Sequence, residues 1–236
     1  MIKRTIKNFV IWIMSIFTPT ETIVRSQDKW DDLARKNARY YVLTDQGEQI
    51  SEQDFRAAGR RDYQKYIVND ELLKDKLSPF SGKKVLEIGA GLGRITEFIA
   101  EEFYDVCAVD ISAEMVKRGQ ERLGERKNVH FFATDGVSYP FSDNLCNLVF
   151  SFITFQHMPS ADVVRKNFQE IGRVLKPGGI AKIQLRGVPV KKASWFYGPA
   201  FTVDSLTSLI GRGLSVVKTE GEGTKYFWVW LEKIRN

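Results

Sequence analysis

A glycine-rich turn at residues 85–94 has a composition that could bind a ligand. The segment reads VLEIGAGLGR, an apolar run followed by three glycines at alternate positions. Gly89, Gly91 and Gly93 would let the backbone turn sharply and come close to a ligand. A tight turn between a strand and a helix would need the same residues without any ligand. Partners elsewhere in the chain must therefore decide whether this turn is a site.

The charged residues of this turn indicate which ligand it suits. A dinucleotide site has the spacing G-x-G-x-x-G, with a small residue where this chain has Arg94. No Lys-Ser or Lys-Thr pair follows the glycines, and the carboxylate of Glu87 would repel a phosphate group. The spacing G-x-G-x-G after an acid therefore favours a ligand that carries a cation and no phosphate.

Two further acids stand at the ends of the next two strand-like runs. Asp110 follows the glycine turn by about 20 residues, and a carboxylate there can accept hydrogen bonds from both hydroxyls of a ribose. Asp135 lies before Gly136 and can accept a hydrogen bond from an adenine amino group. Each acid alone could instead cap a helix or close a surface turn. Acids at three successive strand ends together indicate a nucleoside site.

The chain contains two histidines as candidate bases. His130 lies inside a strand-like run, and we expect it to be structural. His157 follows the fourth strand-like run, at the end of the sheet where a ligand would bind. It could deprotonate an acceptor hydroxyl, because its ordinary pKa is near neutrality. It could equally shape the acceptor pocket through a hydrogen bond to the backbone, and both roles stay open at this stage.

An alternation of short apolar runs and helical stretches positions these residues. Ser112 and Ser160 are expected to cap two of the helices, and Pro177-Gly178-Gly179 is expected to close the second. Such alternation predicts an α/β fold with a mostly parallel sheet, whose ligand lies at the carboxyl ends of the strands. The expected strands are Val85–Ile88, Val106–Asp110, Val129–Thr134, Cys146–Ser151, Ile180–Leu185, Leu214–Lys218 and Tyr226–Leu231.

These segments together resemble a known enzyme family. VLEIGAGLGR, AVDISAEM, ATDG, SFITFQHM and RVLKPGG occur in this order. The set resembles class I S-adenosylmethionine-dependent methyltransferases and is most similar to the UbiE-like, or type-11, group that acts on small molecules and lipids. The resemblance is close from Val85 to Leu185 and continues in pattern to the last residue. It implies a Rossmann-like seven-stranded sheet whose last strand is antiparallel.

The resemblance also implies site residues and a cofactor, S-adenosylmethionine. Gly89, Gly91 and Gly93 would pack under the methionine and ribose part of the cofactor, and Asp110 would bind the ribose hydroxyls. Glu87 would orient the loop and favour the sulfonium charge. The remaining implied contacts are to the adenine, from Ile111, Met115, Asp135 and Gly136.

The helical N-terminal region matches no comparably specific motif. We expect residues 1–80 to form a helical cap and residues 81–236 to form the methyltransferase domain, since such helices often cover the cofactor in this family. Arg60 and Arg61 could pair with the carboxylate of the cofactor or could lie on a solvated helix face. Candidate pocket residues are Tyr40, Tyr41, Arg60, Tyr63 and Phe155.

The first residues combine cations with an apolar stretch. Lys3, Arg4 and Lys7 precede an apolar segment at residues 9–17, which is far shorter than the roughly 20 residues that span a bilayer. No A-x-A cleavage signal follows, so secretion is disfavoured. A helix here would be apolar nearly all round. It could be a lid helix packed on its own domain or on a second copy in a homodimer, or residues 1–18 could lie on a membrane surface.

Composition excludes several classes of protein. The 236 residues are 43% hydrophobic, which argues against disorder, and the net charge of +6 is scattered without the basic and aromatic clustering of a nucleic-acid groove. Neither Cys107 nor Cys146 stands at a metal-ligand spacing with a histidine, so we expect buried free thiols in a reducing compartment and no metal. We therefore expect a cytoplasmic protein, peripheral on the inner face of the membrane if residues 1–18 bind lipid.

These observations lead to one expected function and two alternatives. The chain is expected to transfer a methyl group from S-adenosylmethionine to a small-molecule or lipid-like acceptor by in-line displacement. The first alternative is a sugar or polysaccharide-precursor methyltransferase without membrane contact. The second is a non-catalytic S-adenosylmethionine-binding or scaffold protein on the same fold.

Overall fold

A single seven-stranded sheet forms the centre of the computed structural model, which describes residues 23–43, 47–190 and 195–235. The strand order is β3-β2-β1-β4-β5-β7-β6. β7 runs antiparallel to β5 and β6, and the remaining pairs are parallel. The predicted fold class is thereby confirmed. The strands are β1 Lys84–Ile88, β2 Asp105–Asp110, β3 Val129–Ala133, β4 Cys146–Ser151, β5 Leu175–Leu185, β6 Leu214–Glu220 and β7 Phe227–Lys233.

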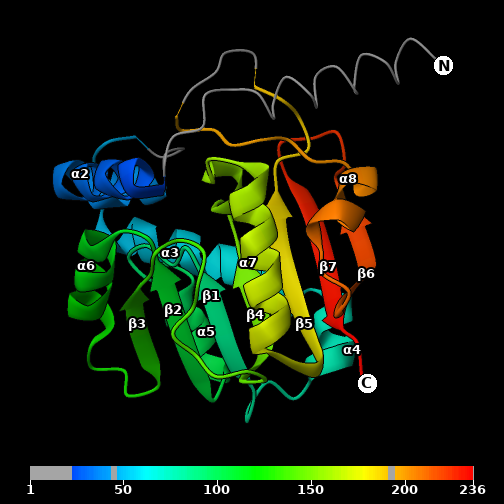
Figure 1. Cartoon of the computed structure of the whole chain (residues 1–236). Helices are drawn as coiled ribbons and strands as arrows, with labels where there is room; N and C mark the ends of the chain where they lie inside the picture. Colours follow the sequence, from blue (N-terminus) through cyan, green and yellow to red (C-terminus); the bar gives the residue numbers. More distant parts are fainter. Residues whose placement is uncertain (1–22, 44–46, 191–194, 236) are drawn as a thin grey trace.

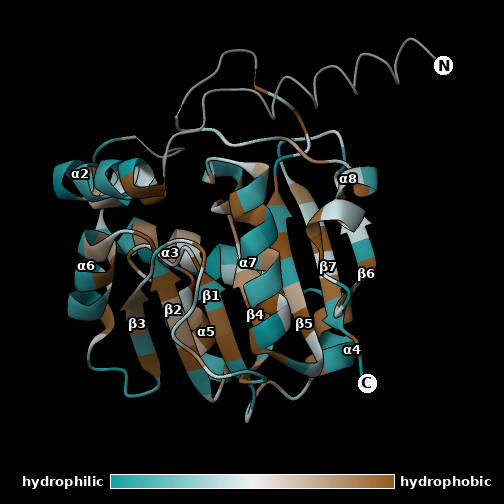
Figure 2. Cartoon of the chain, in the orientation of Figure 1, coloured by the Kyte–Doolittle hydropathy of each residue, from teal (hydrophilic) through white to brown (hydrophobic). Residues whose placement is uncertain are grey.

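Helices cover both faces of this sheet (Figure 1). Successive residues of a strand point to opposite faces of the sheet. On one face, Leu86 and Val149 pack against α7 (Ala161–Val174) and α8 (Val203–Leu209). On the other face, Val85 and Phe150 pack against α4 (Glu71–Leu77) and α5 (Thr96–Glu102). Because both faces are buried, the central strands are apolar throughout, and Figure 2 shows them as brown bands between helices with hydrophilic outer sides.

Serine caps begin three of the helices, as the sequence predicts for two of them. Ser112 accepts a hydrogen bond from the Met115 amide at the start of α6 (Ala113–Leu123), and Ser160 caps α7 in the same way. Ser51 caps α3 (Glu52–Tyr63). Each cap satisfies an amide that has no partner within its helix. These caps fix where the helices leave the carboxyl ends of the strands.

The segment after α7 differs in detail from the prediction. Pro177-Gly178-Gly179 was expected to close the helix, but α7 ends at Val174 and residues 175–185 belong to β5. The pairing of β5 with β4 shifts register between Cys146 and Leu148. Gly178, at a φ of 76°, permits this irregular start, because residues with side chains rarely adopt that conformation.

The N-terminal helices attach to the sheet at two places. α2 (Ile23–Val42) lies at the end of the sheet toward which the arrows of β2 and β3 point in Figure 1. Its Asp31 accepts hydrogen bonds from the Ser112 hydroxyl and, at 3.1 Å, from the Glu114 amide. After the π-helical turn η2 (Gln64–Val68), Asp70 caps α4 and accepts hydrogen bonds from buried Lys182 and Trp230 at 2.6 and 2.9 Å. The division at residue 80 stays a prediction.

Some predictions concern parts of the chain that the structure does not describe. The apolar segment at residues 9–17 and the cations before it lie outside the described residues. Among the helices that are described, none is both long and apolar enough to cross a membrane. Cys107 and Cys146 are buried free thiols, as predicted.

Candidate active site

A cavity opens at the carboxyl ends of β1, β2 and β4, where the fold predicts a ligand. α2 closes it from above with Ile23, Ser26 and Trp30. Of the residues that the sequence singles out, the wall contains Tyr41, Glu87, Gly89, Gly91, Asp110, Ile111, Met115, Gly136 and His157. The tertiary structure thus brings most of the predicted cofactor residues and the candidate base to one cavity.

Two glycines of the loop after β1 contribute directly to the wall. Gly89 has a φ of 73°, and a Cβ atom there would lie 2.0 Å from Oγ1 of Thr154. Gly91 has a φ of 54°, and its amide donates a hydrogen bond of 2.8 Å to Asp110. These positions need glycine for conformation and, at Gly89, for space.

Gly93, the third glycine, has a different environment from the one predicted. It is not part of the cavity wall; a Cβ atom at this position would lie 2.7 Å from Leu123 and 2.8 Å from Phe131. Its φ is 75°. Gly93 therefore allows α6 to pack closely behind the loop, and its predicted contact with the cofactor gains no support from the structure.

Asp110 is a half-buried acid of the cavity wall. One of its carboxylate oxygens accepts the Gly91 amide, and the other accepts the Ser112 amide at 2.9 Å. Burial raises the pKa of Asp110, and the two backbone amides oppose that rise. Each oxygen has two lone pairs and can accept one further hydrogen bond. The geometry leaves Asp110 able to receive a pair of hydroxyls.

Glu87 lies at the bottom of the cavity and is almost fully buried, with 5% of its surface exposed. Burial raises its pKa to about 7, while the Thr96 hydroxyl, which donates a hydrogen bond of 2.5 Å, and the charge of Arg94 act in the opposite direction. A carboxyl group with this pKa changes charge near neutrality. A cation bound in the cavity would favour its ionised form.

Arg94 also lines the cavity, a role that the sequence did not predict for it. Its Nη1 atom donates to Asp62 of α3 at 2.5 Å, and its side chain is 5% exposed. Its Nε atom is buried and has no hydrogen-bond partner in the described part of the chain. Arg94 therefore brings a positive charge to the wall beside the glycine loop.

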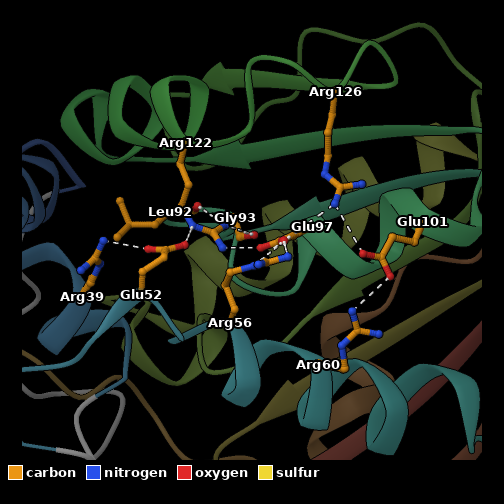
Figure 3. A network of polar contacts seen from close by, with 10 residues as sticks. All are labelled: Arg39, Glu52, Arg56, Arg60, Leu92, Gly93, Glu97, Glu101, Arg122 and Arg126. Atoms are coloured by element: carbon orange, nitrogen blue, oxygen red, sulfur yellow. Dashed lines mark hydrogen bonds and ion pairs between the residues drawn. The ribbon is translucent and has the colours of Figure 1, made fainter. Parts of the chain in front are cut away.

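Behind the loop, a network of charged side chains joins four helices (Figure 3). Arg122 of α6 donates to the backbone carbonyl of Gly93 at 3.2 Å and forms ion pairs with Glu97 and, at 2.9 Å, with Glu52. Arg56 of α3 pairs with Glu97 from the other side at 2.7 Å. Because Glu97 is buried, these pairs are less screened than surface pairs. The network holds the loop from the side opposite the cavity.

His157 lies at the other end of the cavity, after β4, and is 8% exposed. Its Nδ1 contacts the carbonyl oxygen of Phe196, and its Nε2 lies 3.0 Å from Nε2 of Gln156. Burial lowers the pKa of His157 to about 4, although the bond to Phe196 raises it. At neutral pH the ring is therefore uncharged, with Nδ1 as donor and Nε2 as acceptor.

The segment between β4 and His157 contains a strained residue that the sequence did not reveal. Ile153 lines the cavity with a φ of 56°, which is rare for a β-branched residue. Its amide donates to Oε1 of Gln184 at 2.9 Å, and this bond helps to hold the conformation. Strain of this kind is typical of ligand sites, but no sequence pattern identifies a positive φ at isoleucine.

Other predicted residues lie away from the cavity wall. Asp135 is exposed, and its carboxylate accepts the Val137 and Ser138 amides at 2.9 and 2.7 Å, so it closes a turn. Its predicted contact with adenine stays a prediction.

Among the candidate pocket residues, only Tyr41 contributes to the wall. Tyr63 and Phe155 are buried in the two cores, Arg60 is exposed and stacks on Phe98, and Tyr40 packs edge-on against Tyr41. In place of Arg60, the cation that reaches the cavity is Arg94. His130 pairs with Asp105 at 3.0 Å in an exposed position, consistent with the expected structural role.

Comparisons with known proteins agree with this site. Residues 85–179 match a family described as a methyltransferase domain. A demethylmenaquinone methyltransferase of Renibacterium salmoninarum is 31% identical over 165 residues, which cover 70% of this chain and 64% of that protein. Phosphoethanolamine N-methyltransferase 2 of Caenorhabditis elegans is 38% identical over 109 residues, which cover 45% of this chain and 24% of that protein. The chain thus spans less than two thirds of the length of either relative.

A solved structure resembles the fold of this chain over most of the length of this chain. It is Haemonchus contortus phosphoethanolamine N-methyltransferase 1, in complex with phosphoethanolamine and S-adenosylhomocysteine, with a TM-score of 0.68 and 19% identity over 92% of this chain and 50% of that one. The strand order, the glycine loop, the acid after β2 and the matched domain agree with one another. Residues 85–179 therefore form a methyltransferase domain, and the sheet around them has the strand order of the class I S-adenosylmethionine-dependent methyltransferases, which the chain resembles.

Proposed function

We propose that this protein transfers a methyl group from S-adenosylmethionine to a small-molecule acceptor. The observation that carries the proposal is the composition of one cavity wall, which joins Asp110 and the glycine loop at one end to His157 at the other. The first group of residues suits a nucleoside with a cation. The region of the cavity around His157 is separate from this group, and an acceptor can lie there.

The residues of the wall fit the cofactor of the family. The carboxylate of Asp110 can accept the ribose hydroxyls, and Ile111 with Met115 gives an apolar surface for adenine. Glu87 provides negative charge for a sulfonium or an amino group, and Arg94 provides positive charge for a carboxylate. Each charged group of the ligand thus has a counterpart of the opposite sign in this cavity.

The chain's own contribution to the reaction is positioning and the exclusion of water. S-adenosylmethionine supplies a methyl group on a sulfonium whose thioether is a good leaving group. The protein must hold the acceptor in line behind that methyl group. α2 closes the cavity with Ile23 and Trp30, and the ring of Trp30 packs edge-on against His157 at a centroid distance of 5.4 Å. These apolar groups limit access of water to the reacting atoms.

The environment of His157 favours a pocket-forming role over that of a base. Both ring nitrogens have hydrogen-bond partners, and a pKa of about 4 makes the imidazole a weak base near neutral pH. A neutral ring held by the Phe196 carbonyl can orient an acceptor. An acceptor that reaches the site already nucleophilic, such as an amine or an acidic hydroxyl, fits this arrangement best.

The names of the relatives support a small-molecule acceptor without selecting the atom. They include an N-methyltransferase of phosphoethanolamine, a methyltransferase of demethylmenaquinone and an O-methyltransferase of malonyl-acyl-carrier protein. Neither a sugar precursor as acceptor nor a non-catalytic scaffold role has a specific observation in its favour.

A labelled-methyl screen tests the proposed function. The full-length protein would be incubated with radiolabelled S-adenosylmethionine and sets of isoprenoid phenols, nucleotide sugars, amines and small acids. We expect at least one set to give label transfer with one S-adenosylhomocysteine formed per methyl group. Asp110→Ala should lose this turnover. Tight calorimetric binding of the cofactor without turnover on any acceptor would favour the scaffold role, and equal or tighter binding of NAD would contradict the cofactor.

A further inference from the structure

Arg186 is a buried arginine that has no ion-pair partner among the described residues. It follows the last residue of β5, is 6% exposed, and its guanidinium lies 4.4 Å from the centre of the Tyr197 ring. Its Nε and Nη2 atoms are buried without a hydrogen-bond partner in the described part of the chain, and no described carboxylate forms an ion pair with it. Two other arginines with little exposure, Arg94 at 5% and Arg122 at 13% of the side chain, do form such pairs.

This arrangement is costly unless a ligand compensates for it. A guanidinium stays protonated at neutral pH, and an unpaired charge away from water costs several kcal/mol of folding free energy. Nε and Nη2 lie on the same edge of the guanidinium plane, where their N–H groups form a fork. That fork matches the two oxygens of a carboxylate or phosphate. The atoms without partners are thus those that bind an oxyanion.

The position of Arg186 assigns it to the acceptor rather than to the cofactor. Asp110 and the glycine loop follow β2 and β1, whereas His157 and Arg186 follow β4 and β5 on the other half of the sheet edge. The Tyr197 ring stacks on His157 at 6.0 Å and also lies against Arg186. The charge of Arg186 acts on His157, a residue of the cavity wall. Arg186 therefore lies next to the acceptor end of the cavity.

We propose that Arg186 binds an oxyanion of the methyl acceptor, a carboxylate or a phosphate, and so selects anionic small molecules. The identity of the bound molecule as an acceptor rests on the proposed methyl transfer. Because both nitrogens are closed to solvent, Tyr197, which is 40% exposed and covers the guanidinium, must move when the anion enters. A neutral or cationic acceptor would leave the arginine unpaired.

The first test uses simple anions and needs no known acceptor. Full-length protein saturated with S-adenosylhomocysteine, so that the cofactor half is filled, would be titrated with inorganic phosphate and with acetate at constant ionic strength. Trp30, which contacts the His157 ring, provides a fluorescence signal. We expect saturable binding that Arg186→Met weakens at least tenfold. Lys225→Met, which removes an exposed charge that also acts on His157, should change it less than threefold.

A stability measurement separates an anion site from a structural arginine. If the charge is unpaired in the ligand-free protein, Arg186→Met should raise the melting temperature by roughly 2 to 6 °C. A structural arginine would give a lower melting temperature on substitution. A fall in melting temperature, or phosphate binding that is absent or equally tight in Arg186→Met, would overturn the proposal.

The second test concerns the acceptor itself and separates the two proposals. Acids or phosphomonoesters and their neutral methyl esters would be compared as acceptors with labelled S-adenosylmethionine. We expect the anionic member of a pair to be preferred at least a hundredfold in kcat/KM by the wild type and less than tenfold by Arg186→Met. Equal turnover of both members contradicts selection by charge. Anion binding that depends on Arg186, with no turnover of any acceptor, would contradict methyl transfer while retaining the anion site.

Discussion

Burial sets the charge state of the residues that line the cavity. Glu87 and His157 are both almost fully buried, and burial disfavours the charged form of each. The pKa of Glu87 therefore rises to about 7, while that of His157 falls to about 4. At neutral pH a carboxyl that is partly protonated faces a cavity whose histidine is neutral. The pH dependence of ligand binding follows from this difference.

Cofactor affinity is expected to rise with pH around neutrality. The positive sulfonium favours the ionised form of Glu87, so cofactor binding lowers the pKa of Glu87. At a pH between the pKa values of the bound and the free protein, binding therefore releases a proton. Affinity for S-adenosylmethionine should therefore increase as pH rises toward 7, by up to about tenfold per pH unit. Calorimetry from pH 5.5 to 8 measures this slope. Glu87→Gln should show a flatter profile with the same ligand, and identical profiles would remove Glu87 from the site.

Substitution of Asp110 and substitution of Asp135 should affect cofactor binding to very different extents. Asp110→Ala removes the carboxylate that we propose to accept the ribose hydroxyls and should weaken binding about 30- to 1,000-fold, equivalent to roughly 2–4 kcal/mol. Asp135 is exposed and its carboxylate closes a turn, so its predicted hydrogen bond to adenine would compete with water, and Asp135→Ala should change the Kd less than threefold. Titration of both variants with the cofactor gives the comparison. An unchanged Kd in Asp110→Ala would exclude Asp110 from the site.

His157 should affect stability in acid more than catalysis at neutral pH. Its folded pKa, about 4, is below the unfolded value of 6.5, so its contribution is present above pH 6.5 and is lost as pH falls toward 4. The full shift corresponds to about 3 kcal/mol. Glu87 acts with the opposite sign over a similar range, so wild type must be compared with His157→Gln by urea unfolding from pH 4 to 7.5. The variant should lose less stability on acidification.

The kinetics of the same variant distinguish the two roles of His157. If His157 shapes the acceptor pocket, the His157→Gln variant should raise the KM for the acceptor with little change in kcat. If His157 is the general base, its loss in His157→Gln should instead lower kcat by about 10²–10⁴-fold and should remove an acidic limb from the pH profile. That second result would contradict the pocket-forming role.

At the scale of secondary structure, the charged network links α2 and α3 to the glycine loop. Glu52 and Arg56 belong to α3, Glu97 to α5 and Arg122 to α6. Arg39 of α2 joins the network through Glu52 at 2.7 Å (Figure 3). The position of the glycine loop thus depends on four helices, of which α3 and α5 contribute no residue to the cavity wall. Changes in this network should therefore alter both stability and cofactor affinity.

Arg122→Met tests this dependence. It leaves buried Glu97 with fewer partners and removes the donor to the carbonyl of Gly93, which should cost about 2–3 kcal/mol of unfolding free energy and lower the melting temperature by roughly 5–10 °C. Cofactor affinity should fall several-fold. Arg126→Met is the matched control, because Arg126 is 30% exposed and lies 3.7 Å from Glu97 without contacting the loop. Equal effects of the two variants would show that the network does not position the loop.

At the scale of the whole molecule, we predict that the first 18 residues either pack on the protein, as a lid or in a dimer, or contact a membrane. Burial of several of their apolar side chains would contribute roughly 1.5–3 kcal/mol each in either case. The three cations add about 1 kcal/mol each only at an anionic surface. We expect a lid or dimer helix, so deletion of residues 1–18 should lower the melting temperature or break a dimer. Co-sedimentation of the full chain with anionic vesicles, lost on deletion, would contradict this expectation.

The sequence by itself determined the fold and predicted most residues of the cavity wall at the ends of β1 and β2. Its strands are continuous apolar runs because both faces of the sheet are buried, and the glycine turn with Asp110 is local in sequence around two adjacent strand ends. Patterns of this kind depend on backbone conformation and on spacing along the chain. Both can be read without knowing which distant residues meet.

The acceptor half depended on contacts that only the tertiary structure creates. Trp30 reaches His157 from a helix more than 100 residues earlier in the sequence. Arg94 rather than Arg60 reaches the cavity because Arg94 lies in the turn between β1 and α5, whereas Arg60 lies on an exposed side of α3. Tyr63 and Phe155 have the residue types of a pocket but point into the cores. Within the part of the chain that the structure describes, Arg186 is buried without a counter-ion. This too follows from packing, because the sequence does not show which residues surround the guanidinium in space.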